Sequence, residues 1–486
     1  MRTLIHNARY LYTCNDNDEV FRDGHVCIED GLVVAVGGGP APWQQADHVF
    51  DMAGAIVMPG FVNVHHHFFQ SITRAVPLAQ RTLSLDWMFA LYPLWAEYDL
   101  EAMYWSSLLA ASELLLSGAT TSADHSNLHL TAGLDTISEQ VRAVGDAGLR
   151  YHLVRGSLAS MEAGIEARLR PLMGDKIDHL LGRGNDLMAI IETALKSHQS
   201  RAWGTMLDMS VGPGGLAYDM PELMAAHARL ARDYDCGLHT HYHPRPIERQ
   251  ISLQLTGRTP VDYLDQSGWL TPLTWFAHCT ELDDGEIARF AERGVSVSHS
   301  PRTVVRLGYE ITRVSAMRSA GIKVGIGVDG AASNDSGSML GDMRLAQLLH
   351  RSGPDKATPE AWLTPYDTLL MATREGAAIL RRPDIGQLSV GCCGDLTAFD
   401  LASPTFAGAP ADPLGALLMS GADTSALLTV VHGKPRVHCG RMIDIDAANL
   451  IEKSNGAADR ILRLASERTG LRFDSYPGAT RQPQWR

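Results

Sequence analysis

Histidine residues occupy an unusual share of the predicted strand ends in this sequence. His65 and His67 stand two residues apart at the end of an apolar strand, so both side chains point to one face. Two imidazoles on one rigid face can bind the same cation. The later strand ends carry His125, Arg155, Gly212, His241, His278, His299 and Asp329, in a chain with only 20 histidines. This clustering predicts a metal site where the strand ends meet.

The candidate ligands are imidazoles and one carboxylate. His239 and His241 repeat the spacing of the first pair; we expect only one of the two to face the barrel mouth, and favour His241. Asp329 can bind a metal and accept a proton from water, and His278 can act as a ligand or as a base beside it. Three imidazoles and a carboxylate suit Zn²⁺ with an open water position, where the cation lowers the pKa of water. The predicted chemistry is therefore hydrolysis at an electrophilic carbon.

The middle of the chain, residues 59–383, repeats one unit that can position these groups. An amphipathic helix runs into a glycine, such as Gly118, Gly148 or Gly294, and a short apolar strand follows. Glycine supplies the left-handed conformation that ends a helix sharply. Eight such strands, nearly all separated by helices, predict a closed (β/α)8 barrel, in which chemistry belongs at the carboxyl ends of the strands. One helix is expected near 176–198.

The two ends of the chain have a different sequence pattern. Short segments that alternate polar and apolar residues, separated by turns, fill residues 1–58, and the same pattern recurs in 384–445. We expect these two segments to form one small β-sandwich domain. Residues 446–486 are expected to be a tail containing one helix.

The composition excludes several classes of protein. The 486 residues carry 42 Lys+Arg against 55 Asp+Glu, a net charge of −13, which argues against partners such as nucleic acids or anionic membranes. No apolar run approaches the ~18 residues of a membrane span. The N-terminus lacks the apolar core of a signal peptide, and seven cysteines at irregular spacing argue against a disulfide framework. We expect a cytoplasmic protein.

Several motifs resemble those of the amidohydrolase superfamily. They are MPGFVNVHHHFFQSITRAVP (58–77), TTSADH (120–125), LHTHYH (238–243), FAHC (276–279), GVSVSHSP (294–301) and GVDGAASND (327–335). Together they are most similar to the branch that holds 8-oxoguanine deaminase, guanine deaminase and the triazine hydrolases. The resemblance covers nearly the whole chain.

This resemblance implies a role for each candidate residue. The metal ligands would be His65, His67, His241 and Asp329, with His278 orienting the hydrolytic water. The cofactor would be one divalent ion, Zn²⁺ ahead of Fe²⁺ or Mn²⁺. The substrate would be a small heterocycle, and the protein a homo-oligomer, as a dimer. Candidate substrate contacts are Gln70, Trp87, Arg155 and His125.

Two departures from the branch affect the expected mechanism. Deaminases of this branch carry His-x-x-Glu on the fifth strand, and the Glu moves a proton to the leaving amine; here the position is Pro244. His243 or Glu248 could replace that Glu, or Asp329 could carry all proton transfer. The segment HSPRTVVRLG (299–308) also differs, and its Arg302 and Arg306 could bind an acidic group of a substrate.

The predicted reaction is hydrolytic removal of an amino or alkylamino group from an oxo-substituted N-heterocycle such as a purine, pterin, pyrimidine or triazine. Pro244 raises an alternative within the same superfamily, the ring opening of a cyclic amide or imide with Asp329 alone for proton transfer. A second alternative is a barrel retained as a binding module without activity. The intact ligand set argues against it.

Overall fold

The computed structural model describes residues 1–128, 135–161, 164–182, 186–216, 220–242, 245–353, 358–421 and 425–478. Among them, eight parallel strands form one sheet in chain order, β8 (Phe61–Asn63), β9 (Ala119–Ser126), β10 (Arg150–Arg155), β11 (Leu207–Val211), β12 (Leu238–Tyr242), β13 (Thr274–His278), β14 (Ser296–His299) and β15 (Val324–Ile326). The first and last strands meet, because Val64 N–H donates to the Ile326 carbonyl at 3.1 Å. The predicted (β/α)8 barrel is confirmed.

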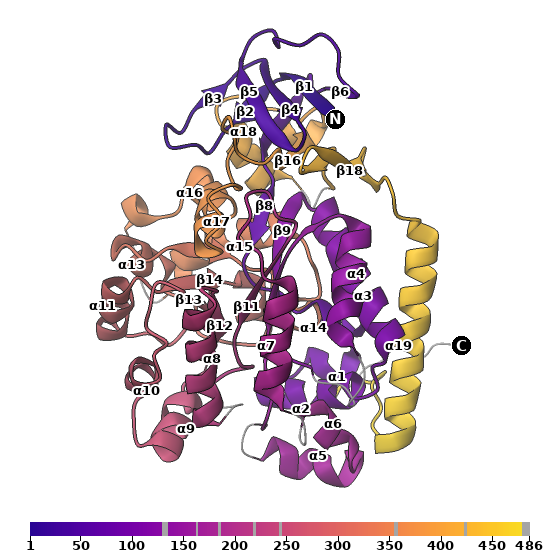
Figure 1. Ribbon diagram of the computed structural model, residues 1–486, viewed down its shortest axis with the longest axis vertical. Helices are drawn as coiled ribbons and strands as arrows, with labels where there is room; N and C mark the ends of the chain where they lie inside the picture. Colours follow the sequence, from indigo (N-terminus) through magenta and orange to yellow (C-terminus); the bar gives the residue numbers. More distant parts are fainter. Residues whose placement is uncertain are drawn as a thin grey trace.

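Helices surround this barrel in the order that the repeat predicts (Figure 1). Gly148 and Gly294 end their helices at φ values of 75° and 69°, the left-handed caps that the sequence indicates. The barrel helices are α3 (Leu100–Leu116), α4 (Thr136–Ala147), α7 (Leu187–His198), α8 (Pro221–Asp233), α9 (Ile247–Thr256), α10 (Pro260–Gln266), α11 (Asp284–Arg293), α13 (Val314–Ser319), α15 (Met339–Leu349), α16 (Pro365–Met371) and α17 (Arg374–Ile379).

One helix prediction was wrong in its extent. The stretch 176–198 holds α6 (Lys176–Leu180) and α7, which begins at Leu187, and α5 (Ile165–Met173) precedes them. Asp186 caps α7 by accepting from the Ala189 N–H, which fixes a new start for that helix. The apolar pattern runs through both helices, because each packs its own side chains into the interior.

Two further sheets are built from both ends of the chain. One has the order β5-β4-β1-β6, and the other has the order β19-β18-β17-β16-β7-β2-β3. Their facing side chains share one core, which includes Ile5, Val26, Leu396 and Val430. The strands are β1 (Arg2–Ala8), β2 (Tyr10–Tyr12), β3 (Val20–Phe21), β4 (Gly24–Glu29), β5 (Leu32–Gly38), β6 (His48–Asp51), β7 (Ala55–Pro59), β16 (Leu396–Asp400), β17 (Leu428–Val431), β18 (Lys434–His438) and β19 (Arg441–Met442). The domain boundaries at 58, 383 and 445 stay a prediction.

The last long helix, α19 (Ala447–Thr469), runs beside α3 (Figure 1). Its Ile461 and Ala465 are buried in a cluster with side chains of α2 (Ser84–Trp95), and Arg460 pairs with Asp99. The tail is therefore part of the barrel wall. Within the described parts of the chain, no helix combines the length and apolar character needed to cross a membrane.

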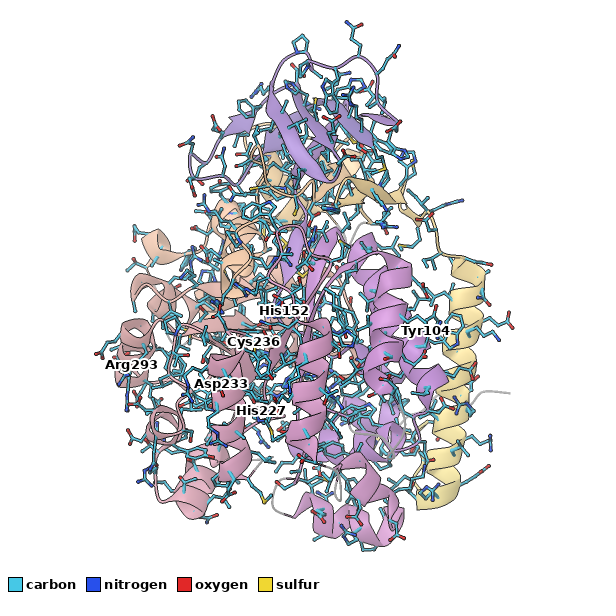
Figure 2. All side chains as sticks on the ribbon, viewed as in Figure 1. Tyr104, His152, His227, Asp233, Cys236 and Arg293 are labelled. Atoms are coloured by element: carbon cyan, nitrogen blue, oxygen red, sulfur yellow. The ribbon has the colours of Figure 1, made fainter. Side chains whose placement is uncertain are left out.

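The sheets from the two termini lie at one end of the barrel, and α1 (Pro77–Gln80) and α2 lie at the other end (Figure 1). Side chains fill the space between strands and helices, where His227 of α8 and Cys236 lie buried (Figure 2). The mouth elements are η1 (Phe68–Thr73), α1, α2, α12 (Pro301–Arg306) and α14 (Ala331–Asn334), which follow the carboxyl ends of β8, β14 and β15.

Candidate metal centre and substrate cavity

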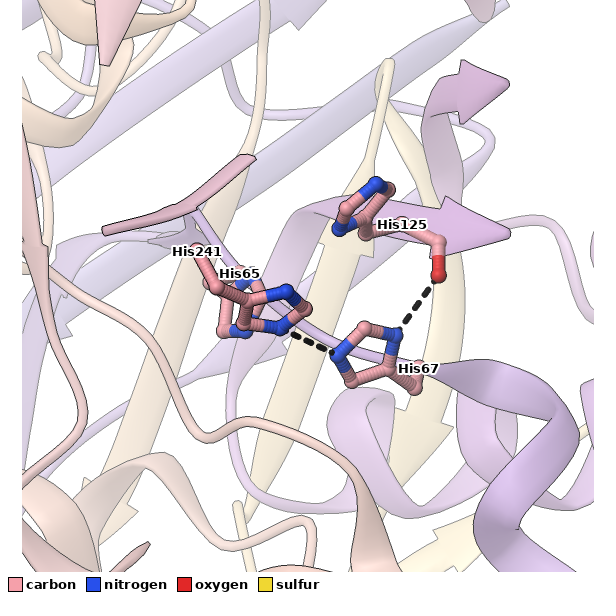
Figure 3. Close-up of side chains that lie close together, drawn as sticks. All are labelled: His65, His67, His125 and His241. Carbon is pink, nitrogen blue, oxygen red and sulfur yellow. Dashed lines mark hydrogen bonds between the residues drawn. The ribbon is translucent and has the colours of Figure 1, made fainter. Parts of the chain in front are cut away.

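Four imidazoles from three strands meet at the barrel mouth (Figure 3). His65 and His67 follow β8, His125 is on β9 and His241 on β12, and one potential ligand atom of each lies within 4.8 Å of the others. Nε2 of His67 faces Nε2 of His241 at 3.0 Å. A second, overlapping group joins His65 to His278 and Asp329. The barrel thus brings together the candidate ligands that the sequence spreads over 265 positions of the chain (from 65 to 329).

Backbone carbonyls fix which nitrogen of each ring carries the proton. His67 Nδ1–H donates to the His125 carbonyl at 2.7 Å, and His241 Nδ1–H donates to the Gly214 carbonyl. A neutral imidazole with a protonated Nδ1 has a lone pair on Nε2. The two Nε2 atoms therefore face each other as acceptors, an arrangement that repels unless a cation lies between them.

His65 also carries its proton on Nδ1, because a second histidine, His239, links it to a backbone carbonyl in a relay of two hydrogen bonds. His239 Nδ1–H donates to the Trp275 carbonyl at 2.8 Å, so its Nε2 accepts from His65 Nδ1–H at 2.7 Å. The remaining Nε2 of His65 is buried, has no hydrogen-bond partner among the described residues and lies 3.3 Å from Asp329 Oδ1. Asp329 Oδ1 is also 3.5 Å from His67 Nε2. Tetrahedral Zn²⁺ ligands at 2.0–2.1 Å are separated by about 3.4 Å, so these donors fit the cation.

Burial keeps the candidate ligands uncharged. It lowers the pKa of His67 from 6.5 to about 4 and lowers the pKa of His65 and His241 as well. Metal binding requires the neutral imidazole, so no proton has to be displaced at neutral pH.

Of His239 and His241, it is the favoured His241 that lines the cavity at the barrel mouth and belongs to a candidate ligand group. Residues two apart on β12 share a face, and both rings enter the cluster, His239 deeper and His241 nearer the mouth. His239 stacks on Trp275 with ring centroids 4.6 Å apart. It supports His65 as the acceptor of its Nδ1–H.

His125 lies with the ligands, although the sequence suggested a substrate contact. Its Nε2–H donates to the Gly212 carbonyl at 3.2 Å, and its buried Nδ1 has no partner among the described groups. His125 is not part of the cavity lining.

His278 and Asp329 have strained backbones at the site. Their φ values are 75° and 61°, a region that residues other than glycine rarely adopt. Such strain clusters at functional sites. Burial lowers the pKa of His278 to about 3, and its ring meets Tyr309 edge-on with centroids 5.8 Å apart.

A cavity opens above these side chains. Gln70 and Trp87, two of the expected substrate contacts, line it together with His67, His241, His278 and Asp329. The rest of the described lining consists of Phe69, Met88, Tyr92, Trp95, Asn127, Leu128, Leu158, Gly214, Leu307, Tyr309 and Ser333. A mostly apolar and aromatic lining with a few polar groups is typical of a site for a small organic ligand.

Arg155 and Glu248 lie outside this lining. Arg155 is buried and donates to the carbonyls of Ser126 and Leu128, so it braces the end of β9. Glu248 pairs with Arg245 at 3.0 Å and lines a different, smaller cavity. The suggested roles in substrate contact and proton transfer do not fit these placements, since both side chains are engaged elsewhere.

The two arginines of the 299–308 segment also point to other partners. Arg306 pairs with Asp335 at 3.0 Å, and Arg302 lies 3.9 Å from Asp342. Neither lines the cavity. His243 and Pro244 lie outside the described residues.

Sequence reasoning missed several lining residues. Asn127 stands two positions after His125, so following that strand end further would have found it. Trp95 and Tyr309 come from an ordinary helix and a loop, and their types and spacing carry no signal of a site.

Comparison with known proteins agrees with this geometry. The model of the Amidohydrolase family matches residues 56–436. The chain is 36% identical to 8-oxoguanine deaminase of Pseudomonas aeruginosa, over 95% of this chain and 99% of the relative. It is 31% identical to hydroxydechloroatrazine ethylaminohydrolase of Pseudomonas sp. strain ADP, over 95% and 96%. The structure of atrazine chlorohydrolase from Arthrobacter aurescens complexed with zinc superimposes with a TM-score of 0.85 at 30% identity, covering 94% of this chain and 100% of that one.

The fold, the histidine cluster and these matches define the class of protein: the chain belongs to the amidohydrolase family. It is an enzyme of the deaminase type that acts on C–N bonds through a histidine-rich metal site.

Proposed function

We propose that this protein is a mononuclear zinc aminohydrolase that removes an amino or alkylamino group from an uncharged, oxo-substituted N-heterocycle. One observation carries the proposal: the Nε2 lone pairs of His65, His67 and His241 converge with Asp329 at the base of the cavity. The relatives that act on 8-oxoguanine and on a hydroxylated triazine support the heterocycle class.

His65, His67, His241 and Asp329 would hold the cation. When bound there, Zn²⁺ would lower the pKa of water towards neutrality. Asp329 Oδ1 accepts the Gly330 N–H at 2.7 Å, which leaves Oδ2 to take a proton from the attacking water and pass it to the leaving amine. His278, with a buried Nδ1 that lacks a partner in the described structure, orients the oxygen that forms on the ring.

The assay that tests this proposal measures ammonia and alkylamine released from a panel of amino-heterocycles by metal-replete protein. Asp329→Asn keeps the size of the side chain and removes the base, so turnover should fall by about a hundredfold or more. Metal content of the variant is measured in parallel. Asp329→Asn with its metal bound and full turnover would rule out this mechanism.

Product mass tests the ring-opening alternative in the same experiment. Ring opening adds water and expels nothing, whereas deamination expels an amine. The pairing of Glu248 with Arg245 is the feature that favours the alternative, because it leaves Asp329 as the single carboxylate among the described lining residues.

We further propose that the enzyme works as a homodimer, as the family resemblance implies, and that it acts in the cytoplasm. Light scattering on the eluting peak of a gel-filtration column should give about twice the chain mass of 52.9 kDa.

A further inference from the structure

Part of the cavity lining is an aromatic wall formed by Phe69, Trp87, Tyr92 and Trp95. Phe69 and Tyr92 pack edge-on against Trp95, with ring centroids 5.2 and 5.4 Å apart. The indole N–H groups are used inside the protein, from Trp87 to the Ala332 carbonyl at 2.8 Å and from Trp95 to Thr73 Oγ1 at 3.1 Å. Lysine and arginine do not occur in the described lining. This wall suits a flat, uncharged ring.

Two carboxamide side chains, those of Gln70 and Asn127, add polar groups to the cavity lining. The oxygens Oε1 of Gln70 and Oδ1 of Asn127 are buried and have no hydrogen-bond partner in the described structure. A buried acceptor without a donor is unfavourable, so an occupant that brings N–H groups is favoured over one that does not. Gln70 packs against Gly330 after β15, and Asn127 lies near Gly214 after β11. Both side chains belong to the cavity lining, and they approach it from different parts of the barrel rim.

The position of Asn127 is set by glycines at the ends of two neighbouring strands. A Cβ on Gly156 would lie 3.0 Å from the Asn127 Cβ, and a Cβ on Gly214 would lie 3.0 Å from its Nδ2. The absence of both methyl groups leaves the space that the carboxamide occupies. The carbonyl of Gly214 also accepts the Nδ1–H of His241. Asn127 is thus packed against the residue that orients a candidate metal ligand.

We propose that Asn127 is a specificity-determining residue whose carboxamide oxygen accepts an N–H from the edge of the substrate. The substrate class follows: an uncharged planar N-heterocycle that keeps at least one N–H away from the reacting carbon. This inference rests on the proposed function, and it assigns to that site a recognition contact beyond the ligands and the base. A ring with the same N–H replaced by N–CH₃ loses the contact with Asn127.

The test compares each turned-over heterocycle with its analogues methylated at one non-leaving nitrogen. Wild type should prefer one N–H substrate over its N-methyl analogue by at least about tenfold in kcat/KM, the value of one good hydrogen bond. Asn127→Leu, which has a similar size and no acceptor, should lower kcat/KM for the N–H substrate by a similar factor and leave the analogue within threefold. Asn127→Ala is the second variant, and metal content and Tm are measured for both.

The outcomes separate this inference from the proposed function. A wild type that releases no amine from any panel member overturns the proposed function and the inference with it. An active wild type whose Asn127 variants keep the full preference at every methylated position overturns the inference alone. Equal losses on substrate and analogue would assign Asn127 a structural role and also overturn it.

Discussion

Each of three imidazoles in the cluster donates a hydrogen bond to a backbone carbonyl oxygen, and this bond fixes the tautomer of the ring. His67, His241 and His239 each donate Nδ1–H to a backbone carbonyl, and His65 donates to His239 instead. Hydrogen bonds of this kind fix the tautomer and orientation of metal-binding histidines. His65, His67 and His241 therefore present their Nε2 lone pairs to the metal position before any cation arrives.

The relay through His239 makes a prediction at this scale. His239→Phe keeps a ring that can stack on Trp275 but removes the acceptor for His65 Nδ1–H. We expect zinc affinity to fall by about 10–100-fold, the usual effect of losing such a supporting contact. Competition with a chelator of known affinity measures it. The control is His227→Phe, a buried histidine of α8 whose Nδ1–H bonds to the Leu223 carbonyl outside the cluster (Figure 2). Equal affinities of wild type and His239→Phe would contradict the relay.

At the scale of elements, α19 closes one side of the barrel although it follows the last strand by many residues. Its buried face packs into the cluster of α2 and η1, and its other face is exposed. Arg460 and Arg468 pair with Asp99 and Glu97, which follow α2. The helix thus supports the segment that carries the aromatic wall of the cavity.

Two isoleucines of α19 allow a matched test. Ile461 is fully buried, and its replacement by Ala leaves a cavity, so Ile461→Ala should lower the free energy of unfolding by about 2–5 kcal/mol. Ile451 is 58% exposed on the same helix, and Ile451→Ala should change the free energy by less than about 0.5 kcal/mol. Urea denaturation measures both. Similar small effects at the two positions would show that α19 packs loosely on the barrel.

For the whole molecule, buried ion pairs join the barrel to the sheets from the two termini. Arg150 of β10 pairs with Asp395, just before β16, at 3.0 Å. Nearby, Arg382 pairs with Asp384 at 2.6 Å, and Asp384 accepts the Gly204 N–H at 2.8 Å. Removing one partner of such a pair leaves an uncompensated buried charge.

Asp384 should make the stability of this contact between the barrel and the sheets depend on pH. Burial raises the pKa of Asp384, but the hydrogen bonds and charge of Arg382 and the Gly204 N–H outweigh it and bring the pKa from 3.8 to about 2. A lowered folded pKa contributes stability that is full above pH about 4 and is lost as the pH falls to about 2. The stability difference between wild type and Asp384→Asn should therefore shrink over this range.

Urea denaturation at a series of pH values from 5 to 2.5 checks this expectation. The control is Asp459→Asn, an exposed aspartate of α19. A stability difference between wild type and Asp384→Asn that stays constant down to pH 2.5 would contradict the assignment.

Much of the fold and of the ligand set could be predicted because it depends on local rules. The alternation of a strand puts His65 and His67 on one face, and glycine caps such as Gly148 mark where helices give way to strands. Whether another side chain is available for chemistry or is held in an ion pair depends on how the chain folds around it. Glu248 was one of the candidates for proton transfer, beside His243 and Asp329, and Arg245 holds it at a different cavity.

The sequence by itself determined the barrel, the composite sheets and the strand ends at which chemistry is placed, because periodicity and capping act over a few residues. Only the tertiary structure decided that His239 supports His65, that His125 joins the ligands, and that Asn127 lines the cavity with its oxygen unpaired among the described residues. These properties arise where separate strands meet, and the neighbours that fix a ring's tautomer or leave an amide without a partner are distant in the chain.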